Sequence, residues 1–212
     1  MDVKDKVILA LGDSITAAQL YLGYLKGLSG AKEVVNYGIG GTTIAKRKKL
    51  LGNEYDKDFI GRVSEMRDKA DVVLVFGGTN DYGHGDVPIG KASDETEDTF
   101  CGCVNILTKS LQAKYPLTKI VFITPLQRVG QDNPFGEGGR KSIPYGTLSE
   151  YVCALKNVVS NYGLPIFDLY TDKDFALDGP YFGKYICEDG LHPTDKGHRL
   201  IAEKIYDFLR AL

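Results

Sequence analysis

Five short apolar runs recur along the chain, each followed by a glycine-rich or polar stretch. They are rich in Val, Ile and Phe, and their apolar positions are continuous rather than alternating. That pattern is typical of strands buried on both faces of a parallel sheet. The predicted strands are Val7–Leu11, Glu33–Tyr37, Val72–Phe76, Ile120–Thr124 and Pro165–Asp168.

Between these runs, apolar residues recur with the period of about 3.6 that marks an amphipathic helix. Asp94 and Glu97 are placed like a capping pair before the third of these helices. The alternation of strands with helices predicts a three-layer α/β fold, with helices on both faces of the sheet. The five stripes are Ile15, Ala18, Leu22 and Leu25; Phe59, Val63, Met66 and Ala70; Phe100, Val104, Leu107 and Leu111; Leu148, Val152, Leu155 and Val159; and Leu200, Ile201, Ile205, Phe208 and Leu212.

Two stretches are longer or richer in Gly and Pro than ordinary connections. They lie near residues 82–96, after the third strand, and 127–147, after the fourth. Loops of this length inside a compact domain are usually functional or disordered. We therefore expect a single domain over residues 1–212 in which these two insertions shape the site.

Composition and charge narrow the classes of function. The formal charge of -2 argues against a protein that binds nucleic acid by bulk electrostatics. The longest apolar runs fall far short of the about 20 residues that a membrane span needs. The first residues show no signal peptide, so we expect a cytoplasmic location, although a secreted form without its leader would look the same. The four cysteines lack metal-ligand spacing, and we expect them to be reduced.

Candidate catalytic side chains follow several of the predicted strands. Ligands of open parallel sheets bind beyond the carboxyl ends of the strands, so these residues are expected to meet at one edge. A serine needs a base to become a nucleophile, and His192 is the best candidate of three histidines because Asp189 precedes it by one tight turn. Ser14, His192 and Asp189 together are the parts of a serine hydrolase.

The oxyanion that forms during acyl transfer needs preorganised donors. The backbone amide of Ser14, an amide of Gly40 or Gly41, and the side chain of Asn80 could fill this role. Asp13 and Asp81 flank the same motifs. We interpret them as structural carboxylates that accept hydrogen bonds from backbone amides of neighbouring loops.

The motifs that carry these residues resemble those of the SGNH/GDSL hydrolase family. The sequence has GDS near its start, a glycine after the second strand, GTND after the third and DGLHP near its end, in the family's order. The resemblance maps the nucleophile onto Ser14, the second-block glycine onto Gly41 and the third-block asparagine onto Asn80. It maps the aspartate and histidine of the last block onto Asp189 and His192.

The same resemblance implies a flavodoxin-like αβα fold with a parallel five-stranded sheet of order 2-1-3-4-5. It also implies hydrolysis of esters or thioesters without a cofactor. The first block departs from the family name by having Ile15 in place of leucine. That position is expected to pack beneath the site, so the departure puts little in doubt.

Other motifs have weaker functional interpretations. The glycines after the second strand do not fit a dinucleotide-binding pattern, and the histidines lack the spacing of a metal site, so we expect no metal. The basic run Lys46–Lys49 is interpreted as a solvated face, with attraction of an anionic substrate as the alternative. His84, Tyr82 and Tyr145 fall near the site loops and are candidates for the substrate rim.

The sequence therefore predicts a serine esterase that acts on small acyl or O-acetyl esters, including esters on carbohydrate. The expected partner is a small-molecule ester, and the oligomeric state is not indicated. Two alternatives stay open at this point. One is a lysophospholipase or thioesterase of the same family, and the other is a non-catalytic module that binds carbohydrate or acyl groups on the same fold.

Overall fold

A computed structural model describes residues 1–212, the whole sequence. Its centre is a five-stranded, all-parallel sheet of order β2-β1-β3-β4-β5, which confirms the order implied by the family resemblance. The strands are β1 (Val7–Gly12), β2 (Glu33–Gly38), β3 (Val72–Phe76), β4 (Lys119–Ile123) and β5 (Ile166–Phe167). Each strand lies within a few residues of its predicted position.

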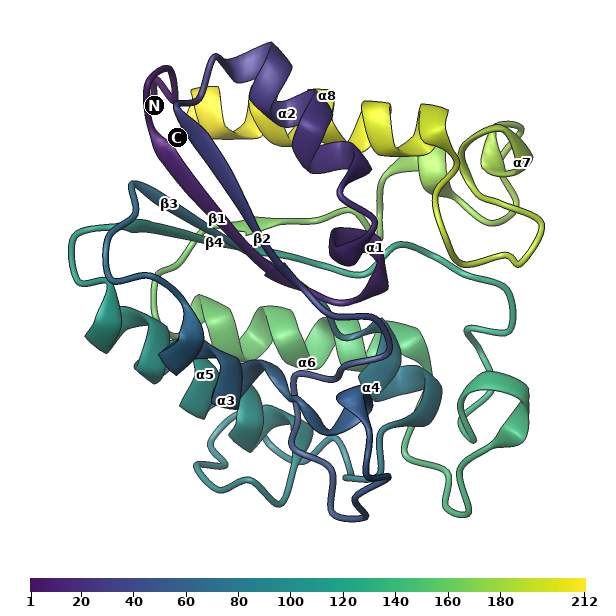
Figure 1. Cartoon of the computed structure of the whole chain (residues 1–212). Helices are drawn as coiled ribbons and strands as arrows, with labels where there is room; N and C mark the ends of the chain where they lie inside the picture. The colour runs from purple at the N-terminus through teal and green to yellow at the C-terminus, as the bar shows by residue number, and fades with distance from the viewer.

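Helices cover both faces of this sheet. Figure 1 shows α2 (Leu20–Ser29) and α8 (Asp195–Ala211) on one face, and α3 (Phe59–Arg62), α5 (Phe100–Lys114) and α6 (Leu148–Ser160) on the other. Shorter helices lie at the ends of the strands and in the loops. They are α1 (Ser14–Ala17), α4 (Thr79–His84), α7 (Phe182–Tyr185) and the 3₁₀ turns Glu54–Asp56, Val63–Glu65, Glu137–Gly139 and Lys173–Phe175.

Two apolar cores form because successive strand residues point to opposite faces of the sheet. In β1, Leu9 and Leu11 belong to the core beneath α5 and α6, whereas Ile8 and Ala10 belong to the core beneath α2 and α8. Strands β1 and β3 are buried almost completely, as their continuous apolar sequences predict. Strand β2 is only half-buried along its length because it lies at the edge of the sheet.

The first predicted helix is wrong as a single element. It is broken between α1 and α2, where Gln19 adopts a left-handed conformation with φ 68°. Asn36 from β2 stabilises the break by donating a hydrogen bond from its side-chain amide to the Thr16 carbonyl at 3.0 Å. Ala18, expected in the apolar stripe, is consequently exposed.

The second predicted helix is also shorter than its apolar pattern suggests. α3 ends at Arg62, a 3₁₀ turn follows, and Met66 is extended. Lys114 at the end of α5 donates from its ammonium group to the carbonyls of Val63 and Ser64 at 3.0 and 3.2 Å. These backbone carbonyls therefore have a hydrogen-bond donor although the segment is not helical. The apolar residues of the predicted stripe still pack in or against the core.

Helix α5 begins with a different cap from the predicted one. Thr99 is the N-cap, and its hydroxyl accepts a hydrogen bond from the Gly102 amide at 3.0 Å. Asp94 supports this cap by accepting a hydrogen bond from the Thr99 hydroxyl at 2.9 Å. Glu97 pairs instead with Lys46, at 3.2 Å. The predicted Asp94–Glu97 capping pair is therefore wrong.

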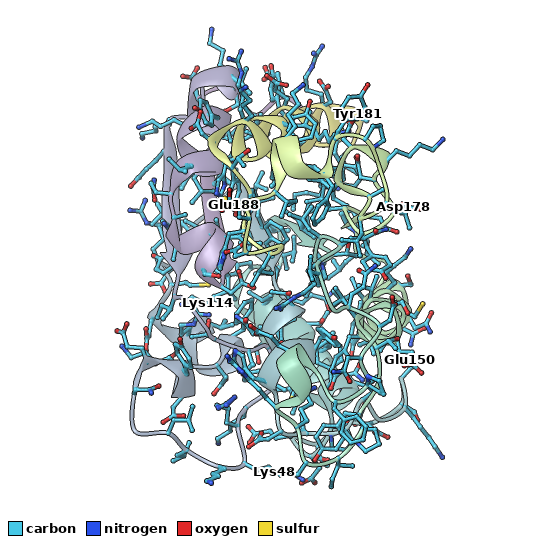
Figure 2. The ribbon with its side chains drawn as sticks, turned by 90° about the vertical axis from the view of Figure 1, so that its right-hand side faces the viewer. Lys48, Lys114, Glu150, Asp178, Tyr181 and Glu188 are labelled. Atoms are coloured by element: carbon cyan, nitrogen blue, oxygen red, sulfur yellow. The ribbon has the colours of Figure 1, made fainter.

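The two termini lie side by side, at the end of the sheet where the strands begin (Figure 1). The Met1 amino group donates a hydrogen bond to the Leu209 carbonyl at 2.7 Å. The loops that follow the strands gather at the opposite end, which Figure 2 views face on. None of the helices is both long enough and apolar enough to cross a membrane.

The central strand provides a test of how much the core contributes to stability. Leu74 in β3 is fully buried, whereas Leu117 is 100% exposed. We expect Leu74→Ala to lower the free energy of unfolding by about 2–5 kcal/mol, since it removes buried methyl groups and leaves a cavity. Leu117→Ala, the matched control, should change it by less than about 0.5 kcal/mol in urea denaturation. Equal effects of the two substitutions would contradict this core assignment.

Candidate active site at the carboxyl edge of the sheet

Ser14 begins helix α1 immediately after the first strand. The preceding turn is tight, and a Cβ atom on Gly12 would lie 2.0 Å from the Thr16 hydroxyl oxygen. Asp13 caps the helix, because its carboxylate accepts a hydrogen bond from the Ile15 amide at 3.1 Å. The Ser14 hydroxyl is thereby held at the end of the sheet where the loops gather.

His192 reaches this serine from the last loop before α8. The loop is closed by a bridge between Ile186 and Pro193, and Gly190 has a left-handed φ of 68°. The Ser14 Oγ atom lies 2.9 Å from Nε2 of His192. Residues that are 178 positions apart in the chain are therefore within hydrogen-bond distance.

Asp189 contacts the other side of the same imidazole. One oxygen of its carboxylate lies 2.6 Å from Nδ1 of His192, and the other accepts hydrogen bonds from the backbone amides of Leu191 and His192. An ionised carboxylate can only accept, so the hydrogen sits on Nδ1 and leaves Nε2 as an acceptor for the serine hydroxyl. Partial burial opposes ionisation, but the hydrogen bonds from His192 and Leu191 lower the pKa of Asp189 below its usual value.

Candidate oxyanion donors surround the serine. The backbone amides of Ser14, Gly40 and Gly41 donate to no acceptor within the protein. Asn80, in the first turn of α4, donates one side-chain N–H to the Thr42 carbonyl at 2.9 Å, and the bond fixes the orientation of its amide group. Gly40, Gly41 and Asn80 line the same small cavity as Ser14 and His192, whereas Thr42 is not among its lining residues.

Of the two glycines, Gly41 is the one whose position demands glycine. It has a φ of 74°, and a Cβ atom there would lie 2.3 Å from the Tyr55 ring. A Cβ atom on Gly40 would meet only the Ser14 side chain, at an ordinary 3.8 Å. Any other residue at Gly41 would displace both the loop and Tyr55.

Asp13 and Asp81 have different partners. Asp81 accepts hydrogen bonds from the amides of Ile44 and Ala45, at 2.9 and 2.8 Å, and thus anchors the loop after β2. Asp13 caps its own helix, so the expectation that it bonds neighbouring loops is wrong. Burial raises the pKa of each carboxyl to about 6, despite the hydrogen bonds from backbone amides.

Arg62 is a buried residue that the sequence analysis missed. Its guanidinium donates to the Gly12 carbonyl at 3.1 and 3.2 Å and also to the Tyr37 carbonyl and the Thr42 hydroxyl. It therefore links the ends of β1 and β2 to the loop that carries the glycines. An arginine within an apolar stripe, as in FIGR, is the one sequence signal that could have indicated this role.

The cavity over Ser14 has a volume of about 380 Å³. His84, at the end of α4, is half-buried in its wall and stacks on Tyr55 with ring centres 5.8 Å apart. From the loops expected to shape the site, His84 comes from the first and Glu137 and Arg140 from the second. The loop after β2, which the sequence analysis considered only for its glycines, contributes four lining residues, against three from the two expected loops together. The lining residues are Ser14, Gly40, Gly41, Glu54, Tyr55, Asn80, His84, Glu137, Arg140, Leu191 and His192.

Two predicted rim residues lie elsewhere. Tyr82 is fully buried in the core, and its hydroxyl donates to the carbonyls of Gly130 and Asn133. Its assignment to the rim is therefore wrong, because α4 turns it inward. Tyr145 is half-buried and lines a neighbouring cavity rather than the one over Ser14.

All four cysteines are free, which agrees with the expectation of reduced thiols. Cys101 and Cys103 are buried in α5, whereas Cys153 and Cys187 are exposed. No group of three or more His, Cys, Asp or Glu side chains is arranged to hold a metal ion.

Comparisons with known proteins agree with this architecture. Residues 10–200 match the model of the GDSL-like Lipase/Acylhydrolase family. No curated protein matches the chain. Among solved structures, a protein from Lactobacillus plantarum is 31% identical, with a TM-score of 0.83 over 99% of this chain and 98% of that one.

Two more distant structures share the fold. A lipase/acylhydrolase from Enterococcus faecalis is 21% identical, with a TM-score of 0.68 over 97% of this chain and 96% of that one. An acetyl xylan esterase is 22% identical, with a TM-score of 0.64 over 96% of this chain and 99% of that one. The family match spans nearly the whole fold, and the chain therefore belongs to the GDSL-like lipase/acylhydrolase family, a family of ester-hydrolysing enzymes.

Proposed function

We propose that this protein is a serine esterase that cleaves small acyl or O-acetyl esters through an acyl-enzyme intermediate. The observation that carries the proposal is the chain of two short contacts, 2.9 Å from Ser14 to His192 and 2.6 Å from His192 to Asp189. A hydroxyl, an imidazole and a carboxylate in this order are the parts of a nucleophile, a general base and the group that orients the base.

In the proposed reaction, the Ser14 oxygen attacks the ester carbonyl while Nε2 of His192 takes the hydroxyl proton. The negative charge that develops on the carbonyl oxygen is stabilised by the amides of Ser14 and Gly41 and by the Asn80 side chain. His192 then protonates the leaving alcohol. Water, deprotonated by the same nitrogen, attacks the acyl-enzyme and releases the acid, which restores Ser14. The residues named here supply every proton transfer, so we propose no cofactor.

The shape and lining of the cavity favour a small substrate. Its volume of about 380 Å³ is near the lower end of ligand pockets. Leu191 is the one aliphatic side chain among its lining residues, and Glu54, Glu137 and Arg140 are charged. A long acyl chain would therefore bury little apolar surface here, which argues against a lysophospholipase. We propose a single domain in which the loops near 82–96 and 127–147, together with the loop after β2, select the substrate.

Replacing the proposed nucleophile tests the reaction directly. We expect Ser14→Ala to lose essentially all turnover of para-nitrophenyl acetate, because no other group is placed to attack the carbonyl. A fluorophosphonate should add its mass to the intact wild-type protein and not to this variant. Ser64→Ala, at an exposed serine bonded to the Gly61 carbonyl, is the control and should behave as wild type. Turnover or labelling retained in Ser14→Ala would refute the nucleophile; a wild-type protein that takes no label would favour the binding-module alternative.

Asn80 provides a separate test of oxyanion stabilisation. We expect Asn80→Ala to lower kcat by about 10²–10³ with a smaller change in KM, because the hydrogen bond strengthens in the transition state. Asn105→Ala removes a buried asparagine that bonds backbone carbonyls far from the site. It controls for loss of stability, and its kcat should stay near the wild-type value. A loss of less than about threefold in Asn80→Ala would reduce this residue to a structural role.

The pH dependence distinguishes His192 from the other histidine of the cavity. The imidazole of His192 must be neutral to accept a proton, so hydrolysis should rise with pH. Burial, aided by the Arg47 charge, lowers the pKa of His84 to about 4, so His84 is uncharged at neutral and mildly acidic pH. We therefore expect His84→Gln to leave the midpoint of the pH profile of kcat/KM unchanged, even where the rate itself changes.

The carboxyls of Asp13 and Asp81, whose pKa burial raises to about 6, are present in both the wild type and His84→Gln, so the comparison isolates His84. A midpoint that moves by more than about half a pH unit in His84→Gln would contradict the assignment of His84 as a neutral wall.

A further inference from the structure

A second cavity opens beside the one over Ser14. It has a volume of about 450 Å³ and shares Tyr55, His84 and Arg140 with its neighbour. The stacked pair of Tyr55 and His84 is thus a wall common to both spaces. A molecule bound over Ser14 can extend past this wall without leaving the surface of the protein.

The basic run Lys46–Lys49 is divided by the structure between this cavity and its surroundings. Lys46 pairs with Glu97 at 3.2 Å, and Lys48 pairs with Asp98 at 3.6 Å. Arg47 and Lys49 instead line the second cavity. Figure 2 shows Lys48 at the lower edge of the face where the loops gather. Half of the run is therefore neutralised by surface carboxylates, and half faces the cavity.

The cavity holds more positive than negative charge. Arg47, Lys49, Arg140 and Lys141 line it, and none of the four has a carboxylate oxygen within 4.0 Å. Asp86 is the one carboxylate of the lining, and its two oxygens accept the backbone amides of Lys48 and Lys49 at 3.0 and 2.8 Å. This excess is local, because the whole chain has a formal charge of -2.

The acidic residues of the cavity over Ser14 do not neutralise this excess of positive charge. Glu137 pairs with Arg128 at 3.3 Å, and Glu54 pairs with Lys57 at 3.5 Å. Each has a cation of its own outside the basic cavity.

Two of the cations still have donors to offer. Arg47 donates through Nη1 to the His84 carbonyl at 2.9 Å and contacts Nδ1 of His84 at 3.2 Å, while its Nη2 makes no hydrogen bond within the protein. Lys141 donates to the Asp81 carbonyl and to the Tyr151 hydroxyl, which leaves one of its three N–H groups free. Burial lowers the pKa of Lys141 to about 8, so it stays mostly protonated at neutral pH. A cationic donor that lines a cavity without a carboxylate partner marks a place where an anion would be stabilising.

We propose that this second cavity is an anion subsite, which binds a carboxylate or phosphate group of the same ester whose carbonyl lies over Ser14. The proposal rests on the proposed esterase function and names the substrate class as small anionic esters. Arginine presents a planar set of donors that matches the oxygens of carboxylate and phosphate, and such charge-assisted bonds are stronger than neutral ones. The adjoining cavities would hold the two ends of one small molecule.

Matched esters test the preference for an anion. In the first pair, mono-para-nitrophenyl glutarate and its methyl ester, the carboxylate that is present or absent lies in the acyl half. In the second pair, para-acetoxybenzoate and para-acetoxybenzamide, it lies in the alcohol half. In at least one pair, we expect wild-type kcat/KM to be about tenfold higher for the anionic ester at low salt. Added salt should reduce this ratio, because part of the cavity is solvent-exposed.

Three variants separate the subsite from the general effect of removing a charge. We expect Arg47→Gln and Lys49→Gln each to reduce the anionic-to-neutral ratio of kcat/KM severalfold. Lys49 is exposed and makes no side-chain bond, so its variant keeps the test intact if Arg47→Gln fails to fold. Lys48→Gln removes the same charge from the neighbouring position and should leave the ratio as in wild type. A ratio near one in wild type, or an equal fall in Lys48→Gln, would overturn the proposal.

Binding measured without turnover separates this proposal from the proposed function. Calorimetric titration of Ser14→Ala protein with inorganic phosphate, and separately with glutarate, should show binding that Arg47→Gln in the same background weakens about tenfold. A protein that hydrolyses no ester but binds either anion in this way would overturn the esterase and keep the anion site. An active esterase that binds neither anion, and has no anionic preference, would overturn the anion site alone.

Discussion

A buried arginine holds together the segments on which the candidate site depends. Parallel strands end at the same edge of a sheet, but each end leaves backbone carbonyls without partners. Arg62 donates to carbonyls at the ends of β1 and β2 and to the Thr42 hydroxyl. Burial lowers the pKa of Arg62 to about 10, so it remains charged at neutral pH. The serine turn and the glycine loop are therefore fixed relative to each other by one side chain.

The other half of the site is positioned by packing. His192 lies just before α8, which packs beside α2 on one face of the sheet (Figure 1). Apolar residues of α8, such as Ile201 and Ile205, are buried in the core that α8 shares with α2. The orientation of α8 brings the start of this helix, and the turn before it, to the carboxyl end of β1. Two segments from opposite ends of the chain meet because both belong to the same layer.

Charge is distributed unevenly over the face where the loops gather. The proposed nucleophile lies in a cavity whose acidic residues each have a cationic partner. The adjoining cavity has four cations and one carboxylate, and that carboxylate is bonded to backbone amides. A small anionic ester that spanned both spaces, as we propose, would satisfy the unpaired donors of one and present its carbonyl to the other. The shape and the charge of this face thus support the same class of substrate.

Local patterns in the sequence were sufficient to predict the strands and the long helices α5, α6 and α8. They also singled out Ser14, Asp189 and His192, which the fold brings within hydrogen-bond distance of one another. Strand burial and helical periodicity depend on neighbours in the chain, and Asp189 and His192 are joined by one short turn. The break at Gln19, the early end of α3 and the inward turn of Tyr82 could not be predicted in this way.

Each of those features depends on a partner that is distant in sequence. Asn36 donates the hydrogen bond that stabilises the break in the first helix. Lys114 donates to backbone carbonyls that follow α3, and the Tyr82 hydroxyl donates to a carbonyl in the loop after β4. The same is true of the basic run, in which alternate residues acquire carboxylate partners or face a cavity only once the chain is folded. The sequence by itself determines which chemical groups the protein has and where the strands and long helices form. Which charged groups stay unpaired is decided only by the tertiary structure, because it depends on contacts between residues that are distant in the sequence.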